Sequence, residues 1–235
     1  MAGLLALIGG NEFRPDCEPM DRALLARLAA DPNVVILPTA AAHENPRLAA
    51  DNGLRYFRRL GARAGAAMIV DAETASQPSL VKQIKSADMV YYTGGDPTYL
   101  LETMRSSPAW QAVLDVLGRG GAMAGSSAGA MICGGQMWSP GHGWREGLGL
   151  VPQMAIIPHH ATLAARWSAG HMRATLLAGV TLVGIDEATA LLGSGQEWMV
   201  LGKGEVAVYN AELPAVFTTG QHVRLNSHLL PEVRL

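Results

Sequence analysis

Charge and cysteine are both scarce in this 235-residue chain. Only 16% of the residues are charged, and the formal net charge is −2 with no strongly basic stretch. Because binding to nucleic acid depends on concentrated Lys and Arg, we expect no nucleic-acid partner. The two cysteines, Cys17 and Cys133, are far apart and indicate neither a metal-binding cluster nor a disulfide framework. We therefore expect a protein of a reducing compartment, the cytoplasm.

Long apolar runs are also lacking. The longest segment without Asp, Glu, Lys or Arg, residues 120–144, contains eight glycines and several polar residues. That composition is not typical of a membrane span. The apolar start, Met1–Ile8, has no positively charged region and predicts a buried first strand rather than a signal peptide. We expect no association with a membrane.

Hydrophobic residues, in contrast, make up 49% of the chain, which is enough for a sizeable core. Short apolar runs predict strands at Leu4–Ile8, Val34–Leu37, Ala66–Val70, Met89–Tyr92, Ala122–Ala124, Met154–Ile157 and Leu182–Ile185. Helical periodicity occurs at Asp21–Ala30, Arg47–Leu60, Ser79–Ser86, Tyr99–Met104 and Ala109–Leu117. This alternation predicts one α/β domain over residues 1–235, with a mostly parallel sheet and helices on both faces. A C-terminal β-hairpin is expected from Trp198–Leu201 and Val206–Tyr209 around Gly202-Lys203-Gly204.

The strongest local motif is Gly125-Ser126-Ser127-Ala128-Gly129, between an expected strand and a helix-compatible segment. Gly-x-Ser-x-Gly in this context is typical of a nucleophile elbow, a strained turn that exposes the serine above the sheet. Ser127 is therefore the predicted nucleophile. The amide of Ala128 would face the oxyanion that develops during attack. The alternative is a helix start that is rich in small residues for packing reasons alone.

A second oxyanion donor is expected from another loop at the same edge of the sheet. Gly94 and Gly95 directly follow the expected strand Met89–Tyr92, and glycines let backbone amides approach a ligand closely. Asp96 comes next and is a candidate substrate-binding residue. Alternatively, Asp96 closes an ordinary turn.

A nucleophilic serine needs a histidine base and a carboxylate that orients the base. Among seven histidines, His159 follows an expected strand end, where active-site residues of this architecture lie. The adjacent His160 would point elsewhere. For the acid, Glu187 follows another strand and is preferred over Asp186, which could instead close the turn. Glu146, in the loop after the elbow, is a rival.

Several spaced motifs resemble the dipeptidase E and cyanophycinase family of serine peptidases. They are Gly9-Gly10-Asn11-Glu12, Thr93-Gly94-Gly95-Asp96, Gly125-Ser126-Ser127-Ala128-Gly129-Ala130, Pro158-His159 and Gly184-Ile185-Asp186-Glu187-Ala188-Thr189-Ala190. The resemblance implies a fold related to the class I glutamine amidotransferases, with no metal or organic cofactor. It also implies Ser127 as nucleophile, His159 as base, and oxyanion amides from Gly95 and Ala128.

The resemblance bears on the third triad member as well. The cyanophycinase branch places a Glu in the segment that matches residues 184–190, which supports Glu187. The dipeptidase E branch uses an Asp from the loop after the elbow, but this chain has no Asp between Ser127 and Asp186.

Substrate choice divides the two branches. Dipeptidase E cleaves dipeptides with an N-terminal Asp and uses an Arg on the helix after the catalytic His. Arg173 stands at the matching distance, and Arg166 lies seven residues earlier on nearly the same helix face. Such a pair could bind a substrate carboxylate, although surface arginines are often simply solvated. Cyanophycinase has a Gln after its Gly-Gly-Asp motif and an aromatic residue after its catalytic His. This chain has Pro97 and His160 at those positions, so its substrate cannot be inferred from either branch.

The predicted function is hydrolysis of small peptides by an exopeptidase or dipeptidase that is a monomer or a homodimer. Three alternatives stay open: cyanophycinase-like hydrolysis of isopeptide-linked Asp-Arg, a small-molecule esterase or amidase, and a binding module without activity. The chain order Ser, His, Glu differs from the Ser, acid, His order of ordinary α/β-hydrolases, which counts against an esterase of that fold.

Overall fold

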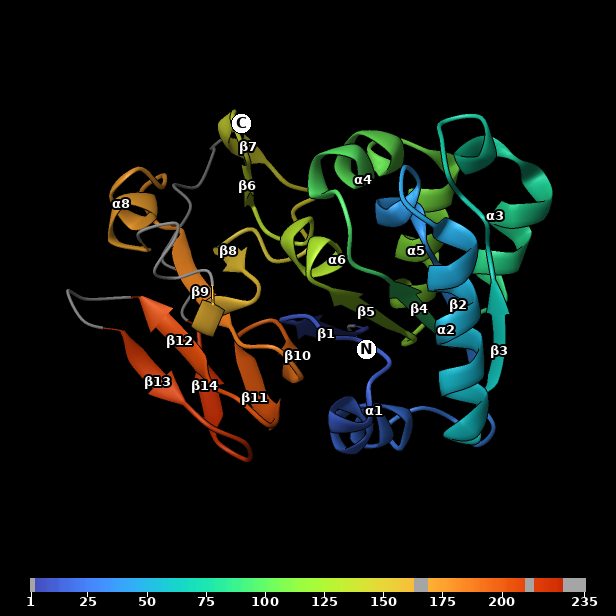
Figure 1. Ribbon diagram of the computed structural model, residues 1–235, viewed down its shortest axis with the longest axis horizontal. Helices are drawn as coiled ribbons and strands as arrows, with labels where there is room; N and C mark the ends of the chain where they lie inside the picture. Colours follow the sequence, from blue (N-terminus) through green and yellow to red (C-terminus); the bar gives the residue numbers. More distant parts are fainter. Residues whose placement is uncertain (1–2, 163–168, 210–213, 226–235) are drawn as a thin grey trace, which may run out of the picture.

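An eight-stranded sheet forms the centre of the protein (Figure 1). The computed structural model describes residues 3–162, 169–209 and 214–225. In spatial order the strands are β14 (His222–Arg224), β11 (Glu197–Gly202), β10 (Thr189–Ser194), β1 (Leu4–Ile8), β5 (Ala122–Ser126), β4 (Met89–Tyr92), β2 (Asn33–Leu37) and β3 (Arg63–Ala66). The five strands from β1 to β3 run parallel, and β10, β11 and β14 add an antiparallel edge. The predicted mostly parallel sheet is confirmed.

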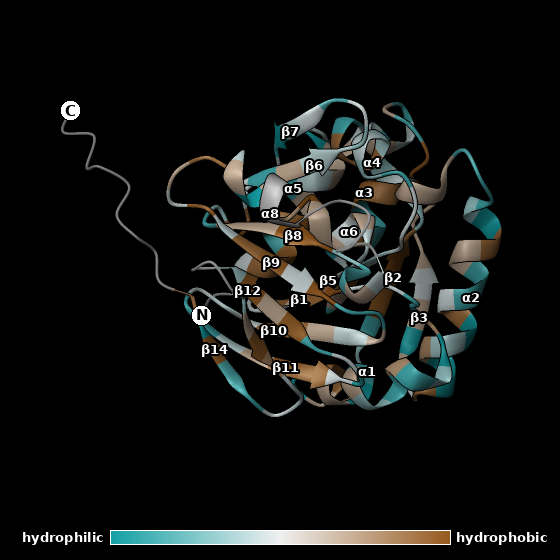
Figure 2. Cartoon of the chain, turned by 60° about the vertical axis from the view of Figure 1, so that its left-hand side comes forward, coloured by the Kyte–Doolittle hydropathy of each residue, from teal (hydrophilic) through white to brown (hydrophobic). Residues whose placement is uncertain are grey.

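Helices cover both faces of this sheet because alternate strand residues point to opposite sides. On one face, Ile8 and Ile36 share a buried cluster with α1 (Glu18–Leu25) and α2 (Pro46–Arg59). On the other face, Leu7 and Leu37 share a second buried cluster with residues of four further helices. Those helices are α3 (Pro78–Lys85), α4 (Pro97–Met104), α5 (Pro108–Gly118) and α6 (Ala128–Met131). Figure 2 shows the hydrophobic residues concentrated on the strands.

Local sequence determines where several helices begin. α2, α4 and α5 each carry a proline in the first turn, where its fixed φ and missing N–H suit a helix start. Each is preceded by a capping side chain, Asn45, Asp96 or Ser107, which accepts a hydrogen bond from a first-turn amide. The starts of these helices lie within two residues of the predicted ones. The predicted first helix, in contrast, begins three residues earlier and ends at Leu25.

A second sheet packs against the antiparallel edge. Its order is β13 (Ala215–Phe217), β12 (Val206–Tyr209), β9 (Thr181–Ile185) and β8 (Met154–Ile157). Val183 and Val208 of this sheet share one buried cluster with Leu191 and Trp198 of the large sheet. The other elements are α8 (Ala169–Ala174), the hairpin β6 (Gln136–Ser139) and β7 (Gly143–Glu146), and three short 3-10 helices, η1 (Pro15–Cys17), η2 (Thr39–Ala41) and η3 (Thr74–Ser76).

Two sequence predictions about strands are wrong. Gly202-Lys203-Gly204 does not close a hairpin, because β11 pairs with β10 and β14, whereas β12 pairs with β9 and β13 in the other sheet. The hairpins at this end are instead β10–β11 and β12–β13. The strand predicted at Ala66–Val70 lies earlier in the chain, at β3, Arg63–Ala66, and the following Ala67 and Ile69 are buried outside that strand.

No described helix combines the length and the apolar character that a membrane span requires.

Candidate active site

Ser127 stands at the sharp turn between β5 and α6. Its backbone has φ 49° and ψ −107°, a conformation that costs energy for a residue with a side chain. The surroundings enforce this conformation. The amide of Ser127 donates to the carbonyl of Ile8 at 2.9 Å. Gly125 and Gly129 meet so closely that a Cβ on Gly125 would lie 2.2 Å from the carbonyl oxygen of Gly129. The local sequence thus builds the turn that a nucleophile elbow requires.

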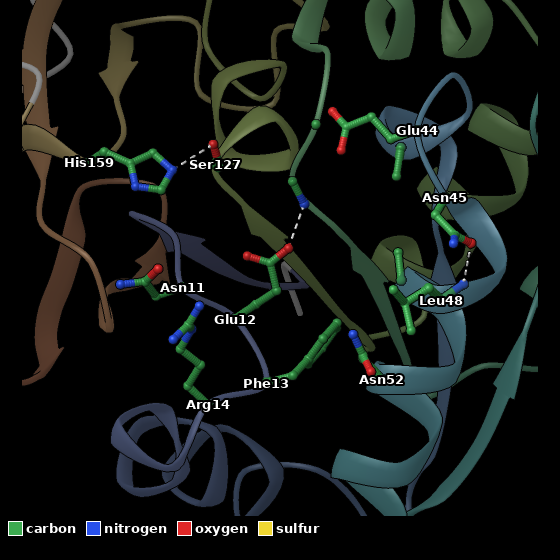
Figure 3. A pocket seen from close by; sticks show the side chains of 14 residues that line it. Asn11, Glu12, Phe13, Arg14, Glu44, Asn45, Leu48, Asn52, Ser127 and His159 are labelled. Carbon is green, nitrogen blue, oxygen red and sulfur yellow. Dashed lines mark hydrogen bonds between the residues drawn. The ribbon is translucent and has the colours of Figure 1, made fainter.

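His159 reaches Ser127 from the loop after β8. Its Nε2 lies 3.1 Å from Ser127 Oγ, the contact drawn as a dashed line in Figure 3. The backbone of His159 also has a positive φ, 49°, and its amide donates to the carbonyl of Gly9 at 2.8 Å. A Cβ on Gly10 would lie 2.1 Å from the imidazole Cε1, so a glycine at this position makes room for the ring.

Glu187 lies on the other side of the imidazole, just after β9. Its Oε1 is 3.1 Å from His159 Nδ1, and the hydroxyl of Thr162 donates to the same oxygen at 3.1 Å. Burial raises the pKa of Glu187, but hydrogen bonds from its own amide, His159 and Thr162 outweigh burial and lower the pKa below its ordinary value. An ionised carboxylate accepts a hydrogen bond from the Nδ1–H group, which leaves Nε2 free to accept one from the Ser127 hydroxyl.

Two backbone amides next to Ser127 suit an oxyanion. Ala128 follows the nucleophile at the start of α6, and Gly95 follows β4 in the neighbouring loop. In the described part of the chain, neither N–H donates a hydrogen bond to another residue. The structure therefore leaves both amides available, in the loops where the sequence predicts them.

The rival acids have other partners. Asp186 accepts hydrogen bonds from the amides of Ala161 and Glu205 at 2.8 and 2.9 Å, so it ties its own loop to two segments that are distant in the sequence rather than closing its own turn. Glu146 is on β7, its side chain is 84% exposed, and its carboxylate lies 3.6 Å from Arg105 Nη1. The structure brings Glu187, and neither of these two, to His159 Nδ1.

Neither Asp96 nor Arg173, the two predicted substrate-binding residues that the structure describes, lines the cavity beside Ser127. Asp96 accepts from the amides of Thr98 and Tyr99, so it serves as the N-cap of α4. Arg173 is half-buried on α8 and is not among the described residues that line the cavity beside Ser127. Arg166 lies outside the described residues.

A cavity of about 620 Å³ opens beside Ser127 and His159 (Figure 3). It is lined by residues 11–14 after β1, by residues of the η2–α2 region, and by the Gly94–Gly95 loop. Their charged and apolar side chains include Glu12, Arg14, Glu44 and Leu48, none of which the sequence analysis singled out as a site residue. One signal was present for Glu12, because it follows a parallel strand at the same edge of the sheet.

An elbow serine, a histidine and a carboxylate on a mostly parallel sheet define a serine hydrolase. The chain belongs to peptidase family S51, whose sequence profile matches residues 4–201, and it is a serine peptidase. Its structure is similar to that of a peptidase from an acI-B1 Actinobacterium, with 29% identity and a TM-score of 0.86 over 96% of this chain and 98% of that chain. A putative Peptidase E protein from Listeria monocytogenes EGD-e shares the fold, with 17% identity and a TM-score of 0.65 over 87% of this chain and 100% of that one. No curated protein matches the chain.

Proposed function

We propose that Ser127, His159 and Glu187 form the catalytic triad of an exopeptidase or dipeptidase that cleaves small peptides through an acyl-enzyme. The observation that carries the proposal is the chain of contacts from Glu187 Oε1 to His159 Nδ1 and from His159 Nε2 to Ser127 Oγ, each 3.1 Å long. Side chains from three separate loops meet in the order that serine acylation requires.

In this mechanism His159 Nε2 takes the hydroxyl proton while Ser127 Oγ attacks the carbonyl carbon of the peptide bond. The negative charge on the carbonyl oxygen is stabilised by the amides of Gly95 and Ala128. When the C–N bond breaks, His159 gives its proton to the leaving amine. A water molecule, deprotonated by His159, then attacks the ester carbonyl; the bond to Ser127 Oγ breaks, the acid product leaves, and His159 returns the proton to Oγ. Glu187 holds the imidazole and stabilises its positive charge in both steps.

The cavity supports a small substrate. Its volume of about 620 Å³ is within the range of ordinary small-ligand sites, and it is walled by α2 and by residues 11–14. Arg14 is a cation that lines the cavity, so we assign Arg14, before Arg173, as the group that would bind a carboxylate on the substrate.

Labelling with a fluorophosphonate probe tests this function without knowledge of the substrate. The expected result is one covalent adduct on Ser127, found by mass spectrometry of the digested protein, and a block of peptide hydrolysis in proportion to labelling. Turnover of aryl esters without turnover of any peptide would indicate an esterase instead. Selective cleavage of an isopeptide-linked Asp-Arg would indicate the cyanophycinase-like reaction.

A further inference from the structure

Glu12 is a carboxylate beside the nucleophile that the proposed mechanism does not use. Its Oε1 accepts a hydrogen bond from the amide of Gly94 at 2.8 Å, and its Oε2 accepts one from the hydroxyl of Ser126 at 2.6 Å. In Figure 3 the carboxylate of Glu12 points toward the loop after β4. One side chain thus joins this loop to the last residue of β5, directly before the elbow.

The loop after β4 has three consecutive amides, at Gly94, Gly95 and Asp96. The first donates to Glu12, and the amide of Asp96 donates to the carbonyl of Ala40 at 2.8 Å. Among the described residues, only the amide of Gly95 has no acceptor in the protein. The N–H that would face the oxyanion therefore lies between two peptide groups that are both fixed by hydrogen bonds.

The packing around this loop leaves it little room. Gly95 has φ 138°, and a Cβ on it would lie 2.2 Å from the carbonyl oxygen of Ala40. A Cβ on Gly94 would lie 3.3 Å from Glu12 Oε1 and also 3.3 Å from Ser127 Cβ. Removal of the Glu12 side chain would open space directly beside the loop and leave the amide of Gly94 free to turn.

The backbone on both sides of Glu12 is strained. Asn11 has φ 61° and Phe13 has φ 66°, values that are uncommon for residues with a side chain. The ring of Phe13 packs against Tyr56 and Tyr91, with centroids 5.6 and 5.1 Å away, which anchors this segment in the core. Strain of this kind persists where the surrounding structure enforces it, and it is concentrated at functional sites. The fold thus holds Glu12 in one fixed position.

The charge of Glu12 does not explain this position. Attack by Ser127 creates a negative charge near the amides of Gly95 and Ala128, and a nearby carboxylate repels it. Both hydrogen-bond donors of Glu12 are neutral groups. What the site can use is the length of the side chain and the two acceptor atoms at its end.

We propose that Glu12 is a positioning residue for the oxyanion site, which holds the Gly94–Gly95 loop against the elbow so that the amide of Gly95 faces the oxyanion. This inference rests on the proposed function and adds to it the residue that assembles its oxyanion site. Because the donors of such a site match the tetrahedral intermediate better than the bound substrate, Glu12 should act on kcat and little on KM.

Three substitutions of Glu12 separate length from charge. Glu12→Ala removes both acceptors. Glu12→Asp keeps the charge, but the side chain is one methylene too short to reach both donors. Glu12→Gln removes the charge and keeps the length, because its amide oxygen can accept from Gly94 while its NH2 group donates to the hydroxyl of Ser126.

Two measurements report the oxyanion site. The first is kcat and KM for the dipeptide that the wild type cleaves fastest in a panel of Xaa-Ala dipeptides. The second is the rate constant of fluorophosphonate labelling, because the adduct on Ser127 places an oxygen at the oxyanion position. Removal of a whole oxyanion donor typically costs about 10²–10³ in kcat, so a misplaced donor should cost about 10–10².

Glu12→Ala and Glu12→Asp should therefore lower kcat by about 10–10²-fold and slow labelling by a similar factor, with KM within about three-fold of the wild type. Glu12→Gln should restore most of both rates. Glu73→Ala, which removes an exposed carboxylate away from the cavity, is the control and should change neither. Urea unfolding of each variant shows which proteins are folded.

Three outcomes would overturn the inference. One is a folded Glu12→Ala with the kcat of the wild type. Another is a loss in Glu12→Gln as large as that in Glu12→Ala, with Glu12→Asp active, because the charge would then be the property that matters. The third is an effect on KM alone. The comparison of Asp with Gln stays decisive if Glu12→Ala does not fold.

Failure of the proposed function would look different. If a fluorophosphonate does not label Ser127 in the wild type, the triad assignment itself is wrong. If the wild type is labelled and cleaves a dipeptide while the Glu12 variants give one of the three contrary outcomes, the role of Glu12 is wrong and the nucleophile stands.

Discussion

Two sets of adjacent residues occupy the same three turns and have different environments. The first set, Ser127, His159 and Glu187, forms a continuous chain of contacts beside the cavity. The second set consists of their chain neighbours, Ser126, His160 and Asp186. Ser126 is fully buried and donates to Glu12, and the side chains of His160 and Asp186 are each 15% exposed.

The second set has its own contacts. His160 Nε2 lies 2.7 Å from the hydroxyl of Tyr209, and its Nδ1 lies 3.5 Å from Asp186 Oδ1. Asp186 also accepts from two backbone amides. Because successive side chains leave a strand end in opposite directions, each turn presents one residue to the substrate and one to the protein interior. Residue type alone therefore does not identify a catalytic group. The comparison predicts that only the first set affects chemistry and that the second affects stability.

The largest expected difference is between the two serines. Ser127→Ala should lower kcat on the order of 10⁴-fold or more, because the nucleophile is removed. Ser126→Ala should keep most of the activity and lower the free energy of unfolding, since the carboxylate of Glu12 loses a hydrogen bond. Steady-state hydrolysis and thermal unfolding of both purified variants measure this. A folded, active Ser127→Ala would refute the whole mechanism.

The two histidines give the next comparison. His159→Ala should be nearly inactive because no base remains, whereas His160→Ala should be active but less stable. Fluorophosphonate labelling rates report the activation of Ser127 in each variant directly. Reversed phenotypes would show that the second set holds the base.

Substitutions of the two acids should affect different properties, catalysis in one case and stability in the other, as well as differing in the size of the effect. Glu187→Gln should lower kcat by orders of magnitude with little change in KM, because the charge on the imidazole is greatest in the transition state. Asp186→Asn should instead destabilise the fold by about 1–3 kcal/mol, because an amide cannot accept from both backbone N–H groups at the two oxygen positions. Rates at saturating and low substrate, with urea unfolding, separate the two effects. If Glu187→Gln is harmless while Glu146→Gln is inactive, the acid comes from β7.

The pH dependence of stability and of kcat distinguishes Glu187 from Asp186 further. The lowered pKa of Glu187 means that its contribution to stability is complete above the pKa of a free glutamate, about 4.3, and is lost as the pH falls through the lowered value. Between neutral pH and its lowered pKa, the carboxylate of Glu187 stays ionised. A fall in kcat on acidification within this range therefore does not arise from Glu187, and the same fall should persist in Asp186→Asn.

The sequence predicts all three residues of the first set but few of the residues that line the cavity. Ser127, His159 and Glu187 each follow a strand end, and the location of strand ends is encoded locally by apolar runs and turn residues. Arg14 and Glu44 belong to loops that meet only when β1 and β2 take their places in the sheet, so no local pattern reveals them. The same limit explains the wrong hairpin: Gly202-Lys203-Gly204 has turn chemistry, but pairing across two sheets depends on distant strands.

The smallest expected effect is that of Tyr209→Phe. This change removes one hydroxyl, at 2.7 Å from His160 Nε2, and keeps the aromatic ring, whose centroid is 5.8 Å from that of His160. Losing this one hydrogen bond should lower the free energy of unfolding by about 0.5–1.5 kcal/mol. Because Asp186 still fixes the turn through the amides of Ala161 and Glu205, kcat and KM should stay within about two-fold of the wild type. A ten-fold loss of kcat with normal stability would show instead that the two sets are coupled, and that the position of His160 controls that of His159. In that case the effect should be non-additive with Asp186→Asn, which a double-mutant cycle on kcat would measure.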